Sequence, residues 1–227
     1  MRRRHGIFNG LIVCSCAVFL FAAVMFTKEA SQRGRARGDF HALADFALYT
    51  PAPAVSVTVQ PDSGLIPAHK RNIAALQQRN PHCIGWVSAP GTHINYPVMH
   101  TPQDPQFYLR RNFEGKYSVA GTPFLDGACT LESENLIIFA HNMDDSSMFA
   151  DLHKYVDEEF RTAHSAIEFE TADGCVYYRV IDVRKVDMRD TWYSFGKKPG
   201  GNRYLTLSTC DIGNKNNRVI LIAERVK

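Results

Sequence analysis

The sequence contains none of the short motifs that mark the common hydrolase and nucleotide-binding sites. No G-x-S-x-G, H-E-x-x-H, G-x-x-x-x-G-K-[ST] or G-x-G-x-x-G pattern occurs in its 227 residues. Serine hydrolysis, zinc proteolysis and nucleotide chemistry therefore lack their usual signatures. The chain also has no CxxC, no Cys/His cluster with zinc spacing and no acidic run with calcium-ligand spacing. We expect no cofactor and no metal.

A strong charge of either sign is also missing. The net charge is +3, with 45% hydrophobic and 22% charged residues, a composition typical of a globular protein. The length suits one domain of about 150 to 200 residues with attachments. Much of the positive charge lies near the amino terminus, and the remainder is close to balanced, so no nucleic-acid partner is indicated. These amino-terminal basic residues are Arg2, Arg3, Arg4, Lys28, Arg33, Arg35 and Arg37.

The six cysteines do not form an obvious disulfide set. Cys14 and Cys16 lie inside an apolar segment, which leaves Cys83, Cys129, Cys175 and Cys210. If Cys210 is a free nucleophile, only one pair can form among the other three. We expect mostly free thiols.

One long apolar run stands near the amino terminus. Residues 6–27 carry no charge, and a helix of about 20 residues crosses the apolar core of a bilayer. A cleaved signal peptide is the alternative, but its apolar region usually runs for only about 7 to 15 residues. An uncleaved anchor is therefore favoured. The leading Arg2 to Arg4 place the amino terminus in the cytoplasm and the rest outside, a bias that the basic residues after the run weaken.

The segments after the anchor predict helices joined by a linker. Residues 29–49 have apolar side chains at helical spacing and predict a juxtamembrane helix or stalk. Residues 50–64 mix Pro, Ser, Val and Gly without a period, which is typical of a linker. A second helix is expected over residues 67–79, ending before Asn80 and Pro81.

The remainder predicts a mainly β fold. Short strand-like runs are separated by turn clusters such as APGT, ADG and KKPGGN, a pattern that favours a barrel or a sandwich. One helix is expected over residues 147–160, because Phe149, Leu152, Val156 and Phe160 form an apolar stripe. The predicted strands cover residues 84–88, 93–99, 118–125, 135–140, 166–171, 176–186, 204–210 and 218–226.

The last two predicted strands carry the most informative pair of residues. Side chains alternate along both strands, and the polar stretch DIGNKNN between them is typical of a hairpin loop. Cys210 then ends one strand and Arg218 begins its partner, with Cβ atoms about 5 Å apart across the pair. A nearby cation favours the nucleophilic thiolate, and Arg offers donors to an oxyanion. The alternative is a small buried Cys beside a solvated Arg.

Among the nine histidines, His141 has the most distinctive position. It follows the apolar strand NLIIFA and precedes the turn NMDDSS, so it stands at the mouth of the sheet, where catalytic side chains are often displayed. A local turn hydrogen bond is the alternative role. A papain-like arrangement is disfavoured, because there the Cys precedes the His.

Three segments together resemble the class B sortases. TLSTC, followed eight residues after its Cys by Arg218, resembles the sortase active-site signature. The upstream NLIIFAHNMDDSSMFADLHKY is similar to the histidine segment of that family, and IGWVSAPGTHINYPVMHTPQDPQFYLRRNFEGKYSVAGTPFLD is similar to the amino-terminal half of the class B domain. The resemblance covers residues 68–227. It implies a closed sortase-type β-barrel of about eight strands with amino-terminal helices and a short inserted helix.

The resemblance implies a cysteine transpeptidase. Cys210 would be the nucleophile, His141 the general acid and base, and Arg218 the residue that stabilises the oxyanion. The resemblance also implies four substrate-binding residues, namely Ser208, Thr209, Asp211 and Tyr193. Tyr193 belongs to residues 187–202, a segment that resembles the wall of the substrate groove in this family. The aromatic residues of this segment are equally compatible with a core.

The resemblance also implies partners and a location. The expected substrates are exported proteins with a carboxy-terminal sorting signal, cleaved after Thr, and the expected acceptor is a peptidoglycan-precursor amine. The alternatives are a pilin-polymerising sortase that uses a Lys amine and a noncatalytic sorting-signal binder. The expected organisation is a basic tip and transmembrane anchor over 1–28, a juxtamembrane helix and linker over 29–67, and an extracytoplasmic catalytic domain over 68–227.

Overall fold

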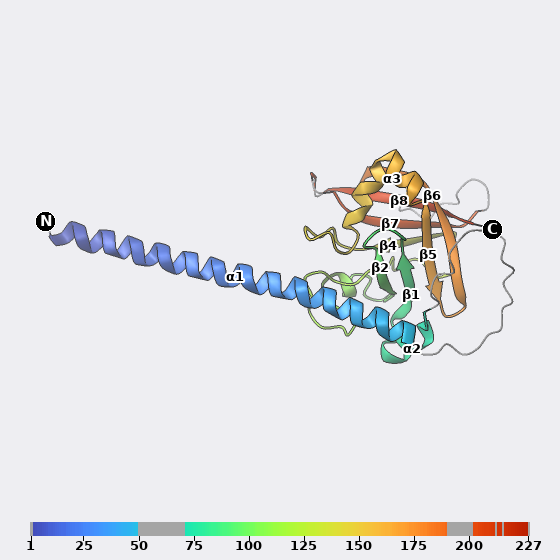
Figure 1. Cartoon of the computed structure of the whole chain (residues 1–227), viewed down its shortest axis with the longest axis horizontal. Coiled ribbons are helices and arrows are strands. Elements are labelled where there is room, and N and C mark those ends of the chain that lie inside the picture. The colour runs from blue at the N-terminus through green and yellow to red at the C-terminus, as the bar shows by residue number, and fades with distance from the viewer. Residues whose placement is uncertain (1, 50–70, 190–201, 212, 215, 227) are drawn as a thin grey trace.

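Eight strands close into one barrel among the residues that the structure describes (Figure 1). The structure is a computed structural model, and it describes residues 2–49, 71–189, 202–211, 213–214 and 216–226. The strands are β1 (Cys83–Ser88), β2 (Asn95–Met99), β3 (Phe124–Leu125), β4 (Asn135–Phe139), β5 (Ala166–Thr171), β6 (Gly174–Asp187), β7 (Tyr204–Cys210) and β8 (Asn217–Arg225). Within these ranges the helices are α1 (Arg2–Tyr49), α2 (Ile73–Arg79) and α3 (Glu158–Ala163), with 3-10 helices η1 (Phe107–Arg110) and η2 (Ala150–Val156).

The barrel has a mixed but mostly antiparallel order. Its strands follow one another as β1-β2-β3-β4-β7-β8-β6-β5, and β5 pairs with β1 to close the ring. The pairs β2–β3 and β4–β7 are parallel, and the other neighbours are antiparallel. The prediction of a closed, mainly β barrel of about eight strands is confirmed. The parallel β4–β7 pair brings two distant chain segments to the same end of the barrel.

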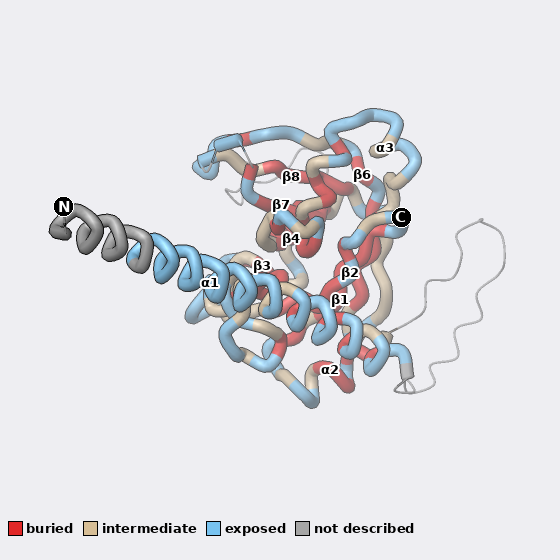
Figure 2. Tube along the Cα trace, turned by 60° about the vertical axis from the view of Figure 1, so that its left-hand side comes forward, coloured by how far each residue is buried: buried red, intermediate tan, exposed pale blue. Residues whose placement is uncertain are grey.

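Buried residues gather within the barrel strands and beneath the amino-terminal helices (Figure 2). Their apolar side chains form one cluster inside the barrel and another below α1 and α2. On β7, Leu205 and Leu207 point into the barrel core, as their alternation predicts. Thr206 and Ser208, on the other face, are also buried, so β7 is covered on both sides. Every residue of β7 before Cys210 is buried, and Cys210 at its end is exposed.

Two predicted elements were wrong in extent. The strand expected over residues 118–125 is reduced to β3, because Gly121 has a φ of +64° in a turn and Pro123 has no N–H for a ladder. The single helix expected over residues 147–160 is instead η2 followed by α3. Asp157 is extended and its side chain accepts a hydrogen bond from the Phe160 N–H, so it ends one helix and begins the next. Val156, expected in the apolar stripe, is therefore 53% exposed.

The amino-terminal helix α1 is continuous over 48 residues and leads away from the barrel (Figure 1). Its segment Cys14–Leu48 includes a window that is apolar and long enough to cross a membrane, and none of that window is buried. The last turns of α1 pack on the domain through four buried side chains at helical spacing. These are Ala36, Phe40, Leu43 and Ala47.

The docking of α1 is specific. Phe40 meets the Tyr96 ring edge-on, with ring centroids 5.2 Å apart. Arg37 forms an ion pair with Asp145, with Nε 3.2 Å from Oδ2. Asp145 belongs to the turn that follows His141, so the helix contacts the region of the predicted site. The predicted linker over 50–64 and residues 67–70 of the predicted second helix lie outside the described residues.

Candidate active site

Cys210 stands at the end of β7, opposite the start of β8. The antiparallel register pairs Cys210 with Arg218, as the alternation of the two strands predicts. Cys210 is exposed, whereas the two residues before it, Ser208 and Thr209, are buried. Its thiol is thus presented by a fixed strand and remains open to a ligand. The six cysteines all lie within the described residues, and all six are free thiols.

His141 comes from the neighbouring strand β4. Parallel pairing sets Phe139 opposite Ser208, and the Ala140 N–H donates to the Ser208 carbonyl at 3.2 Å. The same register carried two residues further brings His141 level with Cys210. The two candidate residues therefore meet although 69 positions separate them in the sequence.

One cavity brings Cys210, His141 and Arg218 together. It has a volume of about 540 Å³, and all three residues line it. Phe124, Phe139 and Leu109 give it apolar walls, which suits an uncharged peptide segment. The three residues come from the ends of β4, β7 and β8, which are consecutive strands of the barrel.

The environment of His141 favours its neutral form. Burial lowers the pKa of the imidazole below its ordinary value, the hydrogen bond to Leu109 opposes this in part, and the Arg110 guanidinium lowers the pKa further. His141 Nε2 lies 2.8 Å from the Leu109 carbonyl oxygen. Since a carbonyl only accepts, Nε2 carries the proton and Nδ1 is the basic nitrogen. Leu109 thus selects the tautomer. Sequence reasoning missed it, because a main-chain carbonyl has no residue-type signal.

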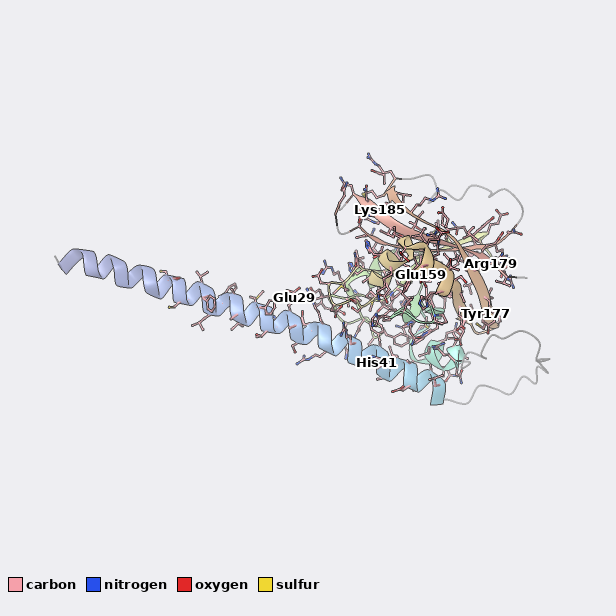
Figure 3. The ribbon with its side chains drawn as sticks, turned by 45° about the horizontal axis from the view of Figure 1, so that its top comes forward. Glu29, His41, Glu159, Tyr177, Arg179 and Lys185 are labelled. Carbon is pink, nitrogen blue, oxygen red and sulfur yellow. The ribbon has the colours of Figure 1, made fainter. Side chains whose placement is uncertain are left out.

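The predicted substrate-binding residues have different surroundings. Ser208 and Thr209 both line the cavity. Asp211 is buried and forms an ion pair with Lys185 of β6, whose Nζ lies 3.2 Å from Asp211 Oδ1. Figure 3 labels Lys185. Burial raises the pKa of the Asp211 carboxyl, but Lys185, the Gly213 N–H and His153 together lower it more, so the net shift of the pKa is downward. A role for Asp211 toward substrate stays a prediction. Tyr193 lies outside the described residues.

Thr209 links the cysteine strand to the histidine strand. Its hydroxyl donates to the Ala140 carbonyl at 2.9 Å, one residue before His141. Replacing Thr209 by Val keeps the shape and removes the donor, so the free energy of unfolding should fall by about 1 to 3 kcal/mol. Urea denaturation measures this. The control Thr209→Ser keeps the hydroxyl, so a loss in the Ser variant as large as in the Val variant would contradict the assignment of the effect to this hydrogen bond.

A group of possible metal ligands lies away from the cavity. Glu168, Glu170 and Cys175, on β5 and β6, have ligand atoms within 4.8 Å of one another. Arg71 already pairs with Glu170, and Ser88 donates to Glu168 at 3.1 Å. Burial raises the pKa of the Cys175 thiol to about 11. A protonated thiol beside a guanidinium is a poor cation site.

The fold and the cavity define a β-barrel protein with a cysteine-centred site at one end of three adjacent strands. Residues 87–226 match the family model of the sortase domain, and the chain therefore belongs to the sortase family. Its relatives in sequence and in structure include class B sortases, in agreement with the predicted class.

The similarity to named class B sortases is moderate in sequence and extends to the fold. The chain is 33% identical to sortase B of Listeria monocytogenes over 162 residues, covering 60% of this chain and 65% of that one. It is 29% identical to sortase B of Staphylococcus aureus over 120 residues, covering 52% of this chain and 49% of that protein. The matched region thus spans less than two thirds of either relative. A crystal structure of sortase B from Bacillus anthracis in complex with AAEK1 superposes with a TM-score of 0.68 at 27% identity, covering 87% of this chain and 99% of that one.

Proposed function

We propose that this protein is a membrane-anchored cysteine transpeptidase of the class B type. The observation that carries the proposal is the meeting of Cys210, His141 and Arg218 in one cavity, each presented by the end of a different strand. A nucleophile, a base and a cationic donor are the three groups that acyl transfer through a thioester requires. A scaffold that only binds a peptide needs none of them.

The first half-reaction cleaves the substrate. The Cys210 thiol gives its proton to His141 Nδ1, and the thiolate sulfur attacks the carbonyl carbon of the Thr in a sorting signal. Arg218 donates hydrogen bonds to the resulting oxyanion. When the tetrahedral intermediate collapses, the C–N bond breaks and His141 returns the proton to the departing amine. A thioacyl bond to Cys210 remains.

The second half-reaction transfers the acyl group. An acceptor amine attacks the thioester carbon while His141 Nδ1 takes a proton from its nitrogen. The C–S bond then breaks, and the sulfur recovers the proton from His141. The neutral tautomer that Leu109 selects suits both halves, because the same Nδ1 accepts and returns the proton. A cell-wall amine is the proposed acceptor.

The helix α1 supports the proposed location. Its segment Cys14–Leu48 contains the exposed apolar window, and together with the uncharged run over residues 6–27 this supports the single membrane anchor predicted over residues 1–28. Residues 29–67 then connect the anchor to the catalytic domain over 68–227. In this arrangement the cavity faces exported proteins and lipid-linked precursors on the outer surface.

The full chain in detergent micelles provides the test. Peptides with NPxTN-like, LPxTG-like and SPxTG-like signals are added, and intact mass spectrometry detects an acyl adduct on Cys210. A cell-wall amine, a Lys-containing pilin peptide and water then compete to resolve the adduct. Formation of an adduct with one peptide and its release by the amine support the proposal. Peptide binding without any adduct would favour a noncatalytic sorting-signal binder.

Arg218 is expected to act on the oxyanion. Its Nη1 donates to the Asn217 carbonyl at 3.0 Å, which orients the guanidinium at the start of β8. Arg218→Ala should lower kcat for peptide cleavage by about 10²- to 10³-fold, as expected for loss of an oxyanion donor. Arg218→Lys keeps the charge but loses the planar fork, so an intermediate loss is expected. Equal activity in the Lys variant and the wild type would reduce the role to charge alone.

A further inference from the structure

The link between the cysteine strand and the histidine strand continues beyond the end of β4. The strand stops at Phe139, but the Ala140 N–H still donates to the Ser208 carbonyl. Along a parallel ladder the same edge of a strand bonds at every second residue. The next bond of this kind would join residue 142 to the carbonyl of Cys210.

A side chain makes that bond in place of the main chain. Asn142 Nδ2 donates to the Cys210 carbonyl at 3.1 Å. The main chain of Asn142 is engaged elsewhere, since it forms an isolated antiparallel bridge with Met148 across the following turn. The main chain therefore leaves the sheet at His141, and the amide of Asn142 keeps the register with Cys210.

A second residue supports the Asn142 amide. His153, on η2, has Nε2 2.9 Å from Asn142 Nδ2 and 3.3 Å from the Cys210 carbonyl oxygen. With His153 Nε2 as the acceptor, one amide group donates to both His153 and Cys210. The amide thus has both of its hydrogens engaged, which fixes its orientation.

We propose that Asn142 is a positioning residue that sets Cys210 in register with His141. The proposal rests on the proposed transpeptidase function. Thr209 bonds to the residue before His141, and Asn142 is the residue after it, so His141 is tied to the cysteine strand on both sides. Cys210 is the last residue of β7 and is exposed. Loss of the Asn142 bond would remove a hydrogen bond that restrains the Cys210 carbonyl. Displacement of reacting groups by about 1 Å can cost about 10²-fold in rate.

Two variants of the full chain in micelles test the role. Asn142→Ala removes the donor, and Asn142→Asp keeps the shape but presents only acceptors toward a carbonyl. Both should lower kcat for peptide acylation by about 10- to 100-fold and leave KM within about twofold of the wild type. The control Asn80→Ala removes an amide that donates to the Phe113 carbonyl and to the Tyr108 hydroxyl, and none of these three residues lines the cavity. It should change the melting temperature without changing kcat.

A second measurement does not depend on the peptide. Alkylation of Cys210 by iodoacetamide is followed across pH with peptide mapping, in the wild type and in the Asn142 and Asn80 variants. A thiol held less closely beside Arg218 should be alkylated more slowly in the Asn142 variants than in the wild type across the profile. If no peptide acylates the wild type, the proposed function fails, and this profile alone decides the positioning role. An unchanged profile, or unchanged kcat in an active enzyme, would overturn the inference.

Discussion

Replacement of Cys210 by Ala is expected to abolish the acyl adduct and to lower turnover by at least about 10³-fold. The thiol is the atom that forms the covalent bond, and no other group at the end of β7 replaces it among the residues that line the cavity. Intact mass spectrometry after incubation with the active peptide measures the adduct directly. The fold should be retained, because Cys210 is exposed and its side chain supports no core packing.

Cys175 offers a matched control for the cysteine experiment. It is a free thiol on β6, outside the cavity, with a pKa raised to about 11 by burial. Cys175→Ala should form the adduct at the wild-type rate. If the adduct persisted in Cys210→Ala and disappeared in Cys175→Ala, the nucleophile would be Cys175 on β6, and the proposed mechanism would fail.

Replacement of His141 by Gln is expected to lower kcat by about 10²- to 10⁴-fold, the usual range for loss of a general acid and base. Gln retains a donor for the Leu109 carbonyl but has no group that accepts and returns a proton near neutral pH. Peptide cleavage kinetics measure the loss. The control is His164→Gln, because His164 lies outside the cavity, with Nδ1 3.3 Å from the Pro90 carbonyl oxygen. This variant should retain the wild-type kcat. Wild-type rates in His141→Gln would remove the base from the mechanism.

The lowered pKa of His141 also predicts the direction of a pH effect on stability. The ordinary value of 6.5 applies in the unfolded chain, and burial lowers it in the folded protein. Between these two values the unfolded chain binds more protons, so stability rises with pH there. The contribution of His141 is therefore complete above pH 6.5 and is lost as the pH falls below it. The free energy of unfolding, measured by urea denaturation at a series of pH values, should depend differently on pH in the wild type and in His141→Gln, and only below pH 6.5.

Local patterns predicted the part of the site that lies within one hairpin. Alternation along β7 and β8 gave the pairing of Cys210 with Arg218, because two adjacent strands joined by a short loop have little choice of register. The position of His141 followed from an apolar strand and a polar turn. The closed barrel was predicted through strand spacing and family resemblance together.

Contacts between distant segments were out of reach of the sequence. The bond from Asn142 to Cys210 spans 68 positions, and the Leu109 carbonyl that selects the His141 tautomer comes from η1. Each depends on how the barrel closes, which no local period encodes. The break at Asp157 was missed for another reason, since its capping bond competes with a continuous apolar stripe.

The continuous helix α1 determines how far the cavity of the proposed enzyme lies from the membrane. Arg37, which forms an ion pair with Asp145 in the turn after His141, lies ten residues beyond Thr27, where the uncharged run ends. At 1.5 Å per residue, that separation is about 15 Å along the helix. In the proposed anchored state, the cavity stays within a thin layer above the bilayer. Partners that diffuse in the same membrane then meet it at a high effective concentration, whereas dissolved peptides must be captured from bulk solution.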